Sequence, residues 1–192
     1  MLDPFGGPSK EKITNPVSAK LCAHSQLGMM MGLALADGQS SIVVDCPKPA
    51  QVERAYKVVR ALHKIWQPGL PLLRLDVPES LLGANGALRA LMTAYCQARD
   101  LPVKRWTRDT ISLTFHRELR QAAGLLFVAG AERLTTLGFE MLRQDMCGVL
   151  GIFCGPAEIM EEAIRASETV ERRMLWLEAQ DLAPAKKTKN AL

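Results

Sequence analysis

The residues with the clearest chemical potential form a short glycine-to-arginine segment, Gly86-Ala87-Leu88-Arg89, which follows a turn of small residues. The pattern predicts a helix that begins at Ala87, with Gly86 and the neighbouring Asn85 just before it. Such a helix start offers free backbone N–H groups and a positive dipole end to an anion. Arg89 adds a permanently charged guanidinium whose planar fork suits phosphate. The segment therefore indicates a phosphate or nucleotide site, in a chain without a standard nucleotide-binding motif.

Two carboxylates, Asp76 and Glu79, stand just before this turn. Oxygen ligands near a phosphate allow a Mg²⁺ ion to assist phosphodiester cleavage, so the pair predicts a catalytic role. Asp76 ends a predicted strand and is therefore expected to lie close enough to the turn to reach the same phosphate. The alternative interpretation is that both carboxylates only cap the turn.

A basic stretch from Arg99 to Arg120 follows the glycine-to-arginine segment. Its cations suit the backbone of DNA, and a tryptophan among them offers a stacking plane for a base. Acidic residues are interleaved in the same stretch, which also fits an ordinary solvated surface. The residues that we assign to DNA binding are Lys104, Arg105, Trp106 and Arg108.

The composition is that of a globular chain with its own core. There are 192 residues, of which 48% are hydrophobic, and the net charge is +4. This mild positive charge permits nucleic-acid or acidic partners without requiring them. The five cysteines are scattered and lack the spacing of a zinc site, which indicates a reduced, cytoplasmic protein. The N-terminus does not resemble a signal peptide, so recruitment to the inner membrane would come through a partner.

The apolar pattern of the first half predicts alternating strands and helices. Short β-branched or apolar runs predict strands, and apolar residues that recur every three or four positions predict helices. Residues 21–36 fit either a helix or a buried hairpin. The predicted strands are 41–46, 70–77, 102–106 and 110–115, and the predicted helices are 50–66 and 87–98.

The last third is predicted to be rich in helix. The apolar run 124–130 fits a strand or a buried helix, 131–143 has a helical pattern, and 147–154 predicts a strand. Pro156 at a first turn, followed by glutamates, predicts one long helix over 156–177.

The domain organisation follows from these elements and from the ends of the chain. Residues 1–20 are rich in proline and glycine and are expected to form a flexible arm. Residues 21–182 are expected to form a single α/β domain with a helical C-terminal extension. Residues 183–192 are expected to be disordered.

The segment GALRALMTAYCQARDLPV, residues 86–103, resembles a box of the ParB/sulfiredoxin superfamily. Members carry a glycine, two variable residues and an arginine at a helix start, with a proline-containing strand start sixteen positions after the glycine, where this chain has Pro102. The helix and strand upstream also resemble the family's arrangement, and the resemblance covers residues 41–115. It implies a small mixed-sheet α/β domain of ParB/sulfiredoxin type with added C-terminal helices.

The resemblance also implies a nucleotide site with ATP and Mg²⁺ as cofactors. Gly86 would allow close approach of a phosphate, and Arg89 would stabilise the charge that develops during hydrolysis. Sulfiredoxins carry a catalytic cysteine where this chain has Ala87, so sulfinic-acid reduction is not expected.

Some proteins with such a degenerate box are plasmid fertility-inhibition factors. They block the transfer of plasmid DNA or T-DNA through a type IV secretion system, and the resemblance implies ATPase and DNA-cleaving activity. The implied partners are the transferring DNA and the coupling protein that feeds the secretion channel. Two alternatives remain open: a non-enzymatic module that occludes a secretion component, and a partition-type DNA-binding regulator. No helix-turn-helix follows the box, which disfavours the regulator.

Overall fold

A computed structural model of the chain describes residues 26–37, 41–66, 69, 72–79, 83–98, 102, 124–145 and 150–178. The predicted arm 1–20, the tail 183–192 and the predicted strand 110–115 lie outside the described residues. Of the predicted strand 102–106 only Pro102 is described, and it is not in a strand.

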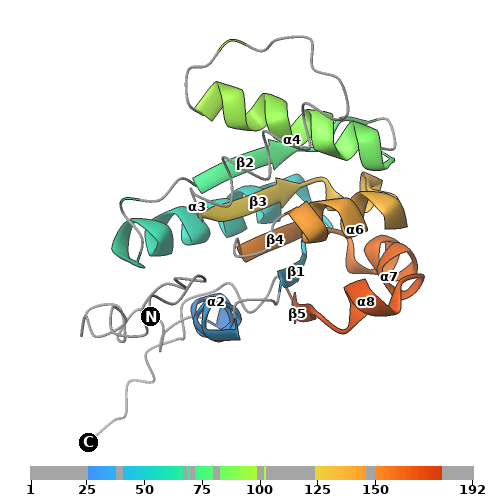
Figure 1. Ribbon diagram of the computed structural model, residues 1–192. Helices are drawn as coiled ribbons and strands as arrows, with labels where there is room; N and C mark the ends of the chain where they lie inside the picture. Colours follow the sequence, from blue (N-terminus) through green and yellow to red (C-terminus); the bar gives the residue numbers. More distant parts are fainter. Residues whose placement is uncertain are drawn as a thin grey trace, which may run out of the picture.

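Five strands form the centre of the described fold (Figure 1). Their order across the sheet is β2-β3-β4-β1-β5, so β1 lies between β4 and β5. The predicted α/β class is confirmed, whereas the predicted mixed sheet is wrong, because every pair of neighbouring strands is parallel. The strands are β1 (Ser41–Asp45), β2 (Leu72–Asp76), β3 (Leu125–Ala129), β4 (Leu150–Gly155) and β5 (Met174–Glu178).

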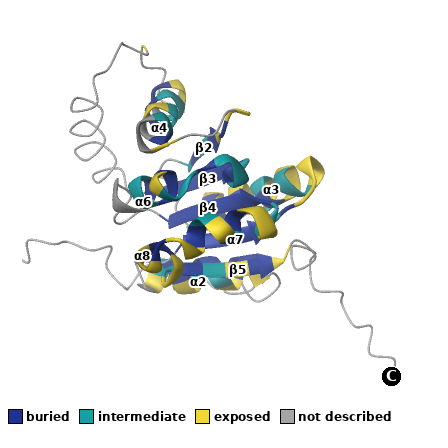
Figure 2. Ribbon diagram, turned by 90° about the vertical axis from the view of Figure 1, so that its right-hand side faces the viewer, coloured by how far each residue is buried: buried dark blue, intermediate teal, exposed yellow. Residues whose placement is uncertain are grey.

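Helices cover both faces of this sheet, because the strands of a parallel sheet are apolar on both sides. One face carries α2 and α3, and the other carries α4, α6, α7 and α8, so the strands are buried between two helical layers (Figure 2). None of the described helices is long and apolar enough to cross a membrane. The helices are α2 (Gln26–Asp37), α3 (Pro49–Trp66), α4 (Ala84–Ala98), α6 (Thr136–Asp145), α7 (Ala157–Arg165) and α8 (Glu168–Glu171), and the 3-10 turn η2 (Ala131–Arg133) precedes α6.

The connections reverse direction at β1. The chain leaves β1 through α3 on one face and reaches the edge strand β2, and it then returns across the sheet through helices on the other face. A crossover that runs in the opposite direction along the sheet has the same handedness only if its helix lies on the opposite face. All the crossovers here therefore share one handedness, as parallel strands require. The two neighbours β1 and β4 therefore send their following helices to opposite faces of the sheet.

The packing of α3 and α6 explains how the two layers are held. Ala55, Val59 and Leu62 recur at helical spacing on α3 and are buried against the sheet. On the opposite face, the rings of Phe139 in α6 and Phe153 in β4 lie 5.3 Å apart in a tilted arrangement. These apolar contacts fix the helices on either side of β1, β3 and β4.

Most of the predicted elements are confirmed. The predicted strands 41–46, 70–77 and 147–154 contain or overlap β1, β2 and β4, and the predicted helix 50–66 is α3. Two ambiguous segments are now assigned, because the run 124–130 is strand β3 and the segment 21–36 contains helix α2. The helical pattern at 131–143 divides into η2 and α6.

The predicted long helix over 156–177 is wrong. Only its first part is helical, as α7 and the short α8, and the chain then enters the sheet as β5. Val170, Met174 and Leu177 recur at helical spacing, but the last two are buried because β5 pairs with β1 along its length. Pairing in the sheet therefore overrides the local pattern.

The placement of α6 predicts that the same substitution lowers the free energy of unfolding by different amounts on its buried and exposed sides. Leu142 of α6 is fully buried, whereas Leu137 of the same helix is 59% exposed. We expect Leu142→Ala to lower the free energy of unfolding by about 2–5 kcal/mol, because it leaves a cavity in the core. Leu137→Ala is the matched control and should change it by less than about 0.5 kcal/mol. Urea denaturation measures both, and equal costs would contradict the placement of α6.

Candidate functional site at the carboxyl edge of the sheet

In open parallel sheets, ligands bind at the carboxyl ends of the strands, where neighbouring connections leave to opposite faces. Here that point lies between β1 and β4. The loop after β1 is short, with Cys46, Pro47 and Lys48 before α3 begins at Pro49. The backbone N–H of Lys48 donates to Oε1 of Gln51 at 2.9 Å, which caps the start of α3.

The end of β1 is tied directly to β4 and α7. The backbone N–H of Ala157, at the start of α7, donates to Oδ1 of Asp45 at 2.9 Å. The N–H of Cys46 donates to the carbonyl oxygen of Gly155 at 2.8 Å. A carboxylate at a helix start satisfies an N–H group that has no partner within the helix. Asp45 therefore occupies the helix N-terminus that would otherwise be offered to an anion.

Glu132 fills the space next to Gly155. After β3, Gly130 turns the chain with φ +73°, and Glu132 follows in the 3-10 turn with its side chain 18% exposed. A Cβ at position 155 would come too close to Oε2 of Glu132 and would lie 3.2 Å from its backbone N, so the carboxylate would have to move to admit a larger residue. Oε1 of Glu132 lies 3.5 Å from Nε of Arg133, and Oε2 is buried without a hydrogen-bond partner among the described residues.

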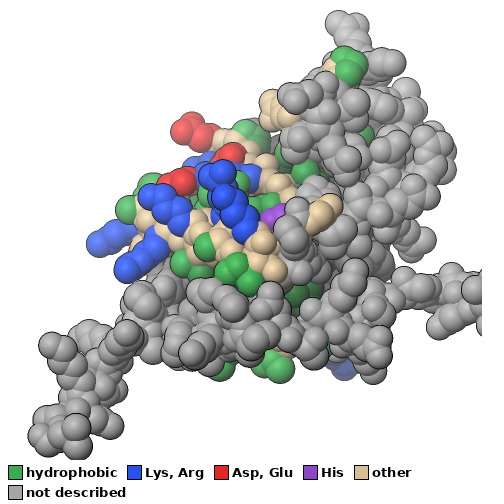
Figure 3. All heavy atoms as spheres, turned by 90° about the vertical axis from the view of Figure 1, so that its left-hand side faces the viewer, with side chains coloured by type: hydrophobic (Ala, Val, Ile, Leu, Met, Phe, Trp, Pro, Cys, Tyr) green, Lys and Arg blue, Asp and Glu red, His purple; other side chains and the backbone are tan. Residues whose placement is uncertain are grey.

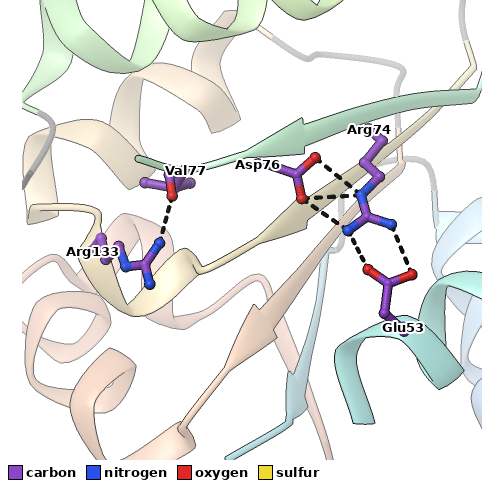
Figure 4. A network of polar contacts seen from close by, with 5 residues as sticks. All are labelled: Glu53, Arg74, Asp76, Val77 and Arg133. Carbon is purple, nitrogen blue, oxygen red and sulfur yellow. Dashed lines mark hydrogen bonds and ion pairs between the residues drawn. The ribbon is translucent and has the colours of Figure 1, made fainter. Parts of the chain in front are cut away.

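The same turn reaches β2. The Nη1 group of Arg133 donates to the carbonyl oxygen of Val77 at 2.7 Å, just beyond the end of β2 (Figure 4). The carboxyl ends of β1, β2, β3 and β4 are thus linked to one another by the chain's own groups.

Two thiols lie beneath this edge. Cys46 and Cys154 are both buried and free of disulfides. Burial raises the pKa of the Cys154 thiol, and its hydrogen bond with Cys46 raises it further. A raised pKa keeps the thiol neutral and unreactive, so the pair packs as small apolar side chains.

Arg74 on β2 forms the densest polar cluster in the described part of the chain (Figure 4). Its guanidinium contacts Glu53 of α3 at 2.5 and 3.1 Å and Asp76 at 2.9 to 3.1 Å, and it lies 4.7 Å from the ring centroid of Tyr56. The hydrogen bonds from Arg74 lower the pKa of Glu53, and those with Glu53 and Asp76 raise the pKa of Arg74. The predicted catalytic Asp76 is therefore engaged by a cation on its own strand.

The structure brings three of the predicted site residues to one cavity. An open cavity of about 730 Å³ lies between β2 and α4, and Asp76, Gly86 and Arg89 line it. Glu79 is exposed after β2 and does not line the cavity, and Asn85 is in α4. Arg89 is exposed and has no ion pair to a described residue.

The predicted start of the helix at Ala87 is wrong. Helix α4 begins at Ala84, and the N–H of Ala87 already donates to the carbonyl oxygen of Gly83 at 2.9 Å. Gly86 therefore lies inside the first turn, and Arg89 lies on the second turn. Alanines favour helix strongly enough to extend it through the glycine.

The predicted DNA-binding residues belong to a part of the chain that the structure does not describe. Lys104, Arg105, Trp106 and Arg108 lie outside the described residues. No three histidine, cysteine, aspartate or glutamate side chains form a metal site within the described ranges. Sequence reasoning missed the groups that link the strands at this edge, although Asp45 is the last residue of β1, and Glu132 and Arg133 follow β3 closely.

No family model and no curated protein matches the chain. Solved structures of Cdc6 and ORC proteins resemble its fold. Cdc6p from Pyrobaculum aerophilum has a TM-score of 0.52 at 11% identity, over 89% of this chain and 48% of that one. ORC2 from Aeropyrum pernix, solved as ADPNP–ADP complexes, has a TM-score of 0.52 at 12% identity, over 92% and 50%. Drosophila ORC bound to AT-rich DNA and Cdc6 has a TM-score of 0.51 at 8% identity, over 89% and 58%.

These similarities define the class of fold. The chain has an α/β fold similar to that of these Cdc6 and ORC structures, and it spans about half the length of the two archaeal neighbours. The assignment to the ParB/sulfiredoxin superfamily is wrong, because the sheet is all parallel and the neighbours are of another class. The spacing from Gly86 to Pro102 matched the box by number alone, since the helix starts earlier and Pro102 is not in a strand. The fertility-inhibition function that depended on this box is not supported.

The contact between Gly155 and Glu132 predicts a coupled pair of substitutions. Gly155→Ala should lower the free energy of unfolding by about 1–3 kcal/mol, because the new methyl group collides with the carboxylate. In a chain that already carries Glu132→Ala, the same change should cost at least about 0.5 kcal/mol less. A double-mutant cycle by urea denaturation measures this coupling, and additive costs would show that Glu132 does not fill the space.

The cluster around Arg74 predicts a dependence of stability on pH. The lowered pKa of Glu53 means that its contribution is present above the ordinary value of 4.5 and is lost as the pH falls through the lower folded value. Glu53→Gln should therefore destabilise the protein at neutral pH by about 0.5–1 kcal/mol, and this difference should vanish in acid.

Glu162→Gln is the matched control for this pH series, since Glu162 is exposed on α7 without an ion pair to a described residue. Its stability difference from the wild type should be small at every pH. A Glu53→Gln difference that persists unchanged below about pH 3 would contradict the ionic role of Glu53.

Proposed function

We propose that the chain is a DNA-associated binding module that has a Cdc6/ORC-like fold but holds no nucleotide at the end of β1. The observation that carries this proposal is the hydrogen bond from the Ala157 N–H to the Asp45 carboxylate. It places a carboxylate that is already bonded to α7 at the carboxyl end of β1, beside the point where nucleotide-binding proteins of this topology hold their ligand.

The residues of the loop support the same conclusion. A P-loop uses glycines, a lysine and a serine or threonine hydroxyl to cradle phosphates and a Mg²⁺ ion. The loop here contains Pro47 and is followed by Pro49, and prolines have no N–H to offer a phosphate. Lys48 is exposed, and its backbone N–H is already used within the loop.

The distribution of charge supports DNA as the partner. On one face of the sheet, α3 carries four exposed cations and a single glutamate. On the opposite face, α7, α8 and the turn after them contain five glutamates and three arginines. A protein with a separate basic face suits a polyanion. The fold-level analogy points the same way, since the Drosophila neighbour was solved on DNA.

A second candidate function is nucleotide binding in the cavity between β2 and α4. The observation in its favour is that Gly86 and Arg89 line this cavity together. Within the described residues, Arg89 is the lining cation that is not ion-paired, since Arg74 is engaged by Glu53 and Asp76.

Thermal and urea unfolding with added ATP and Mg²⁺ test both candidates. A site filled at a hundred times its Kd would raise the free energy of unfolding by about 2.7 kcal/mol. We expect no dependence on nucleotide concentration for the wild-type chain.

If ATP does stabilise the wild type, two variants show where it binds. If ATP stabilises the wild type and Arg89→Ala removes this effect, the second candidate replaces the first. If Asp45→Asn removes it instead, a nucleotide binds at the end of β1 and the proposal is wrong. Binding of a short labelled DNA duplex, measured by fluorescence anisotropy, tests the partner, and a wild-type chain that does not bind would refute DNA association.

A further inference from the structure

Helix α3 carries a line of four cations on its outer face. Arg54, Lys57, Arg60 and Lys64 are all exposed. At 3.6 residues per turn these positions fall within about a third of the helix circumference, and they extend over about 15 Å of its axis. Figure 3 shows lysine and arginine side chains gathered on the side of the molecule where α3 ends.

The helix presents this line rigidly. Its opposite side buries Ala55, Val59 and Leu62 against the sheet, so the helix is held along its whole length. Tyr56, also in α3, lies with its ring 5.1 Å from that of Phe127 in β3. The cations therefore keep their spacing, which reduces the entropy that is lost when they contact a partner.

The four cations are available to a partner. None of them has an ion pair or hydrogen bond through its side chain to any described residue. The acidic residue of the same helix, Glu53, is already occupied by Arg74. Lys57 has a long-range electrostatic interaction with Glu53, and the other three cations are not ion-paired to any described acidic residue, so most of the positive charge of this face is not offset.

The chemistry of the face favours a phosphate backbone. The exposed side chains among the cations are small, such as Ala61. Among the described residues, the large exposed apolar side chains lie on α2, α6, α7 and β5. A membrane-bound helix needs an apolar face beside its cations, and a stable protein interface is usually rich in aromatic residues. A row of cations without either feature matches the sugar-phosphate backbone of DNA.

We infer that the outer face of α3 binds the phosphate backbone of duplex DNA through Arg54, Lys57, Arg60 and Lys64. This inference rests on the proposed association with DNA and names the surface that makes it. It assigns a DNA contact to residues that precede the predicted Lys104, Arg105, Trp106 and Arg108 in the sequence. Phosphate contacts carry no sequence information, so duplexes of unrelated sequence should bind about equally.

The test is a salt series of DNA binding by fluorescence anisotropy with a short labelled duplex. Each phosphate contact contributes about 0.9 to the slope of log K against log salt. Arg60→Gln/Lys64→Gln should lower the magnitude of this slope by about 1.8. When the salt is raised from about 50 to 200 mM, the loss of affinity should therefore be about tenfold smaller for the variant than for the wild type. Substituting all four residues by glutamine should lower the slope by about 3.6. Glutamine keeps the helix propensity, and circular dichroism checks the fold.

Arg165→Gln/Arg172→Gln is the matched control, because it removes the same charge from exposed, ion-paired arginines on the opposite face of the sheet. It should leave the slope nearly unchanged.

If the wild type binds DNA but both double variants change the slope equally, the assignment of the contact to α3 is wrong and the proposed association with DNA stands. If the wild type binds no DNA, the proposed function itself fails. Retention of the full slope by the α3 variant, together with loss of binding to phosphatidylserine vesicles, would assign the face to a membrane and overturn the inference.

Discussion

The described fold depends on the burial of a parallel sheet on both faces. Parallel strands are joined by crossovers that must cover the sheet, and each strand here is apolar on both sides. With β1 in the interior of the sheet, the helix after it lies on one face and the helices that follow lie on the other. All carboxyl ends of the strands therefore meet at one edge, and the reversal between β1 and β4 creates the point where such folds bind ligands.

The chain's own polar groups occupy that point in the described structure. Asp45 caps α7, Cys46 bonds to Gly155, Glu132 packs on Gly155, and Arg133 reaches the end of β2. These contacts use the polar groups of the edge to link the strands to one another. The fold keeps its architecture because the apolar core does not depend on a ligand at the edge.

The two helical layers differ in charge as well as in position. The α3 layer presents unpaired cations, whereas the α7 and α8 layer is rich in glutamate, and several of its arginines are ion-paired. The sheet separates these layers, so their charges do not neutralise each other by direct contact. This segregation follows from the switch in connection at β1, which sends α3 to the face that also carries α2 and sends the later helices to the other face. The position of α3 in the fold thus gives a weakly charged protein one strongly basic face.

The sequence by itself determined the local elements. β-branched runs and helical spacing are short-range patterns, and they located β1, β2, β4 and α3 correctly. These patterns also predicted that Asp76 lies near Gly86 and Arg89, because a strand and a helix joined by a short turn pack side by side. The prediction from the sequence was wrong at β5, because its buried apolar residues also have the spacing of a helix.

Only the tertiary structure decided the order of the strands and therefore the nature of the edge. The hydrogen bond between Asp45 and Ala157 joins positions 112 residues apart, and no local pattern records it. The box from Gly86 to Pro102 matched a family by spacing, but spacing is silent about which strands pair. The physical reason is that strand order is set by long-range burial on both faces of the sheet, whereas residue patterns report only the conformation of each segment.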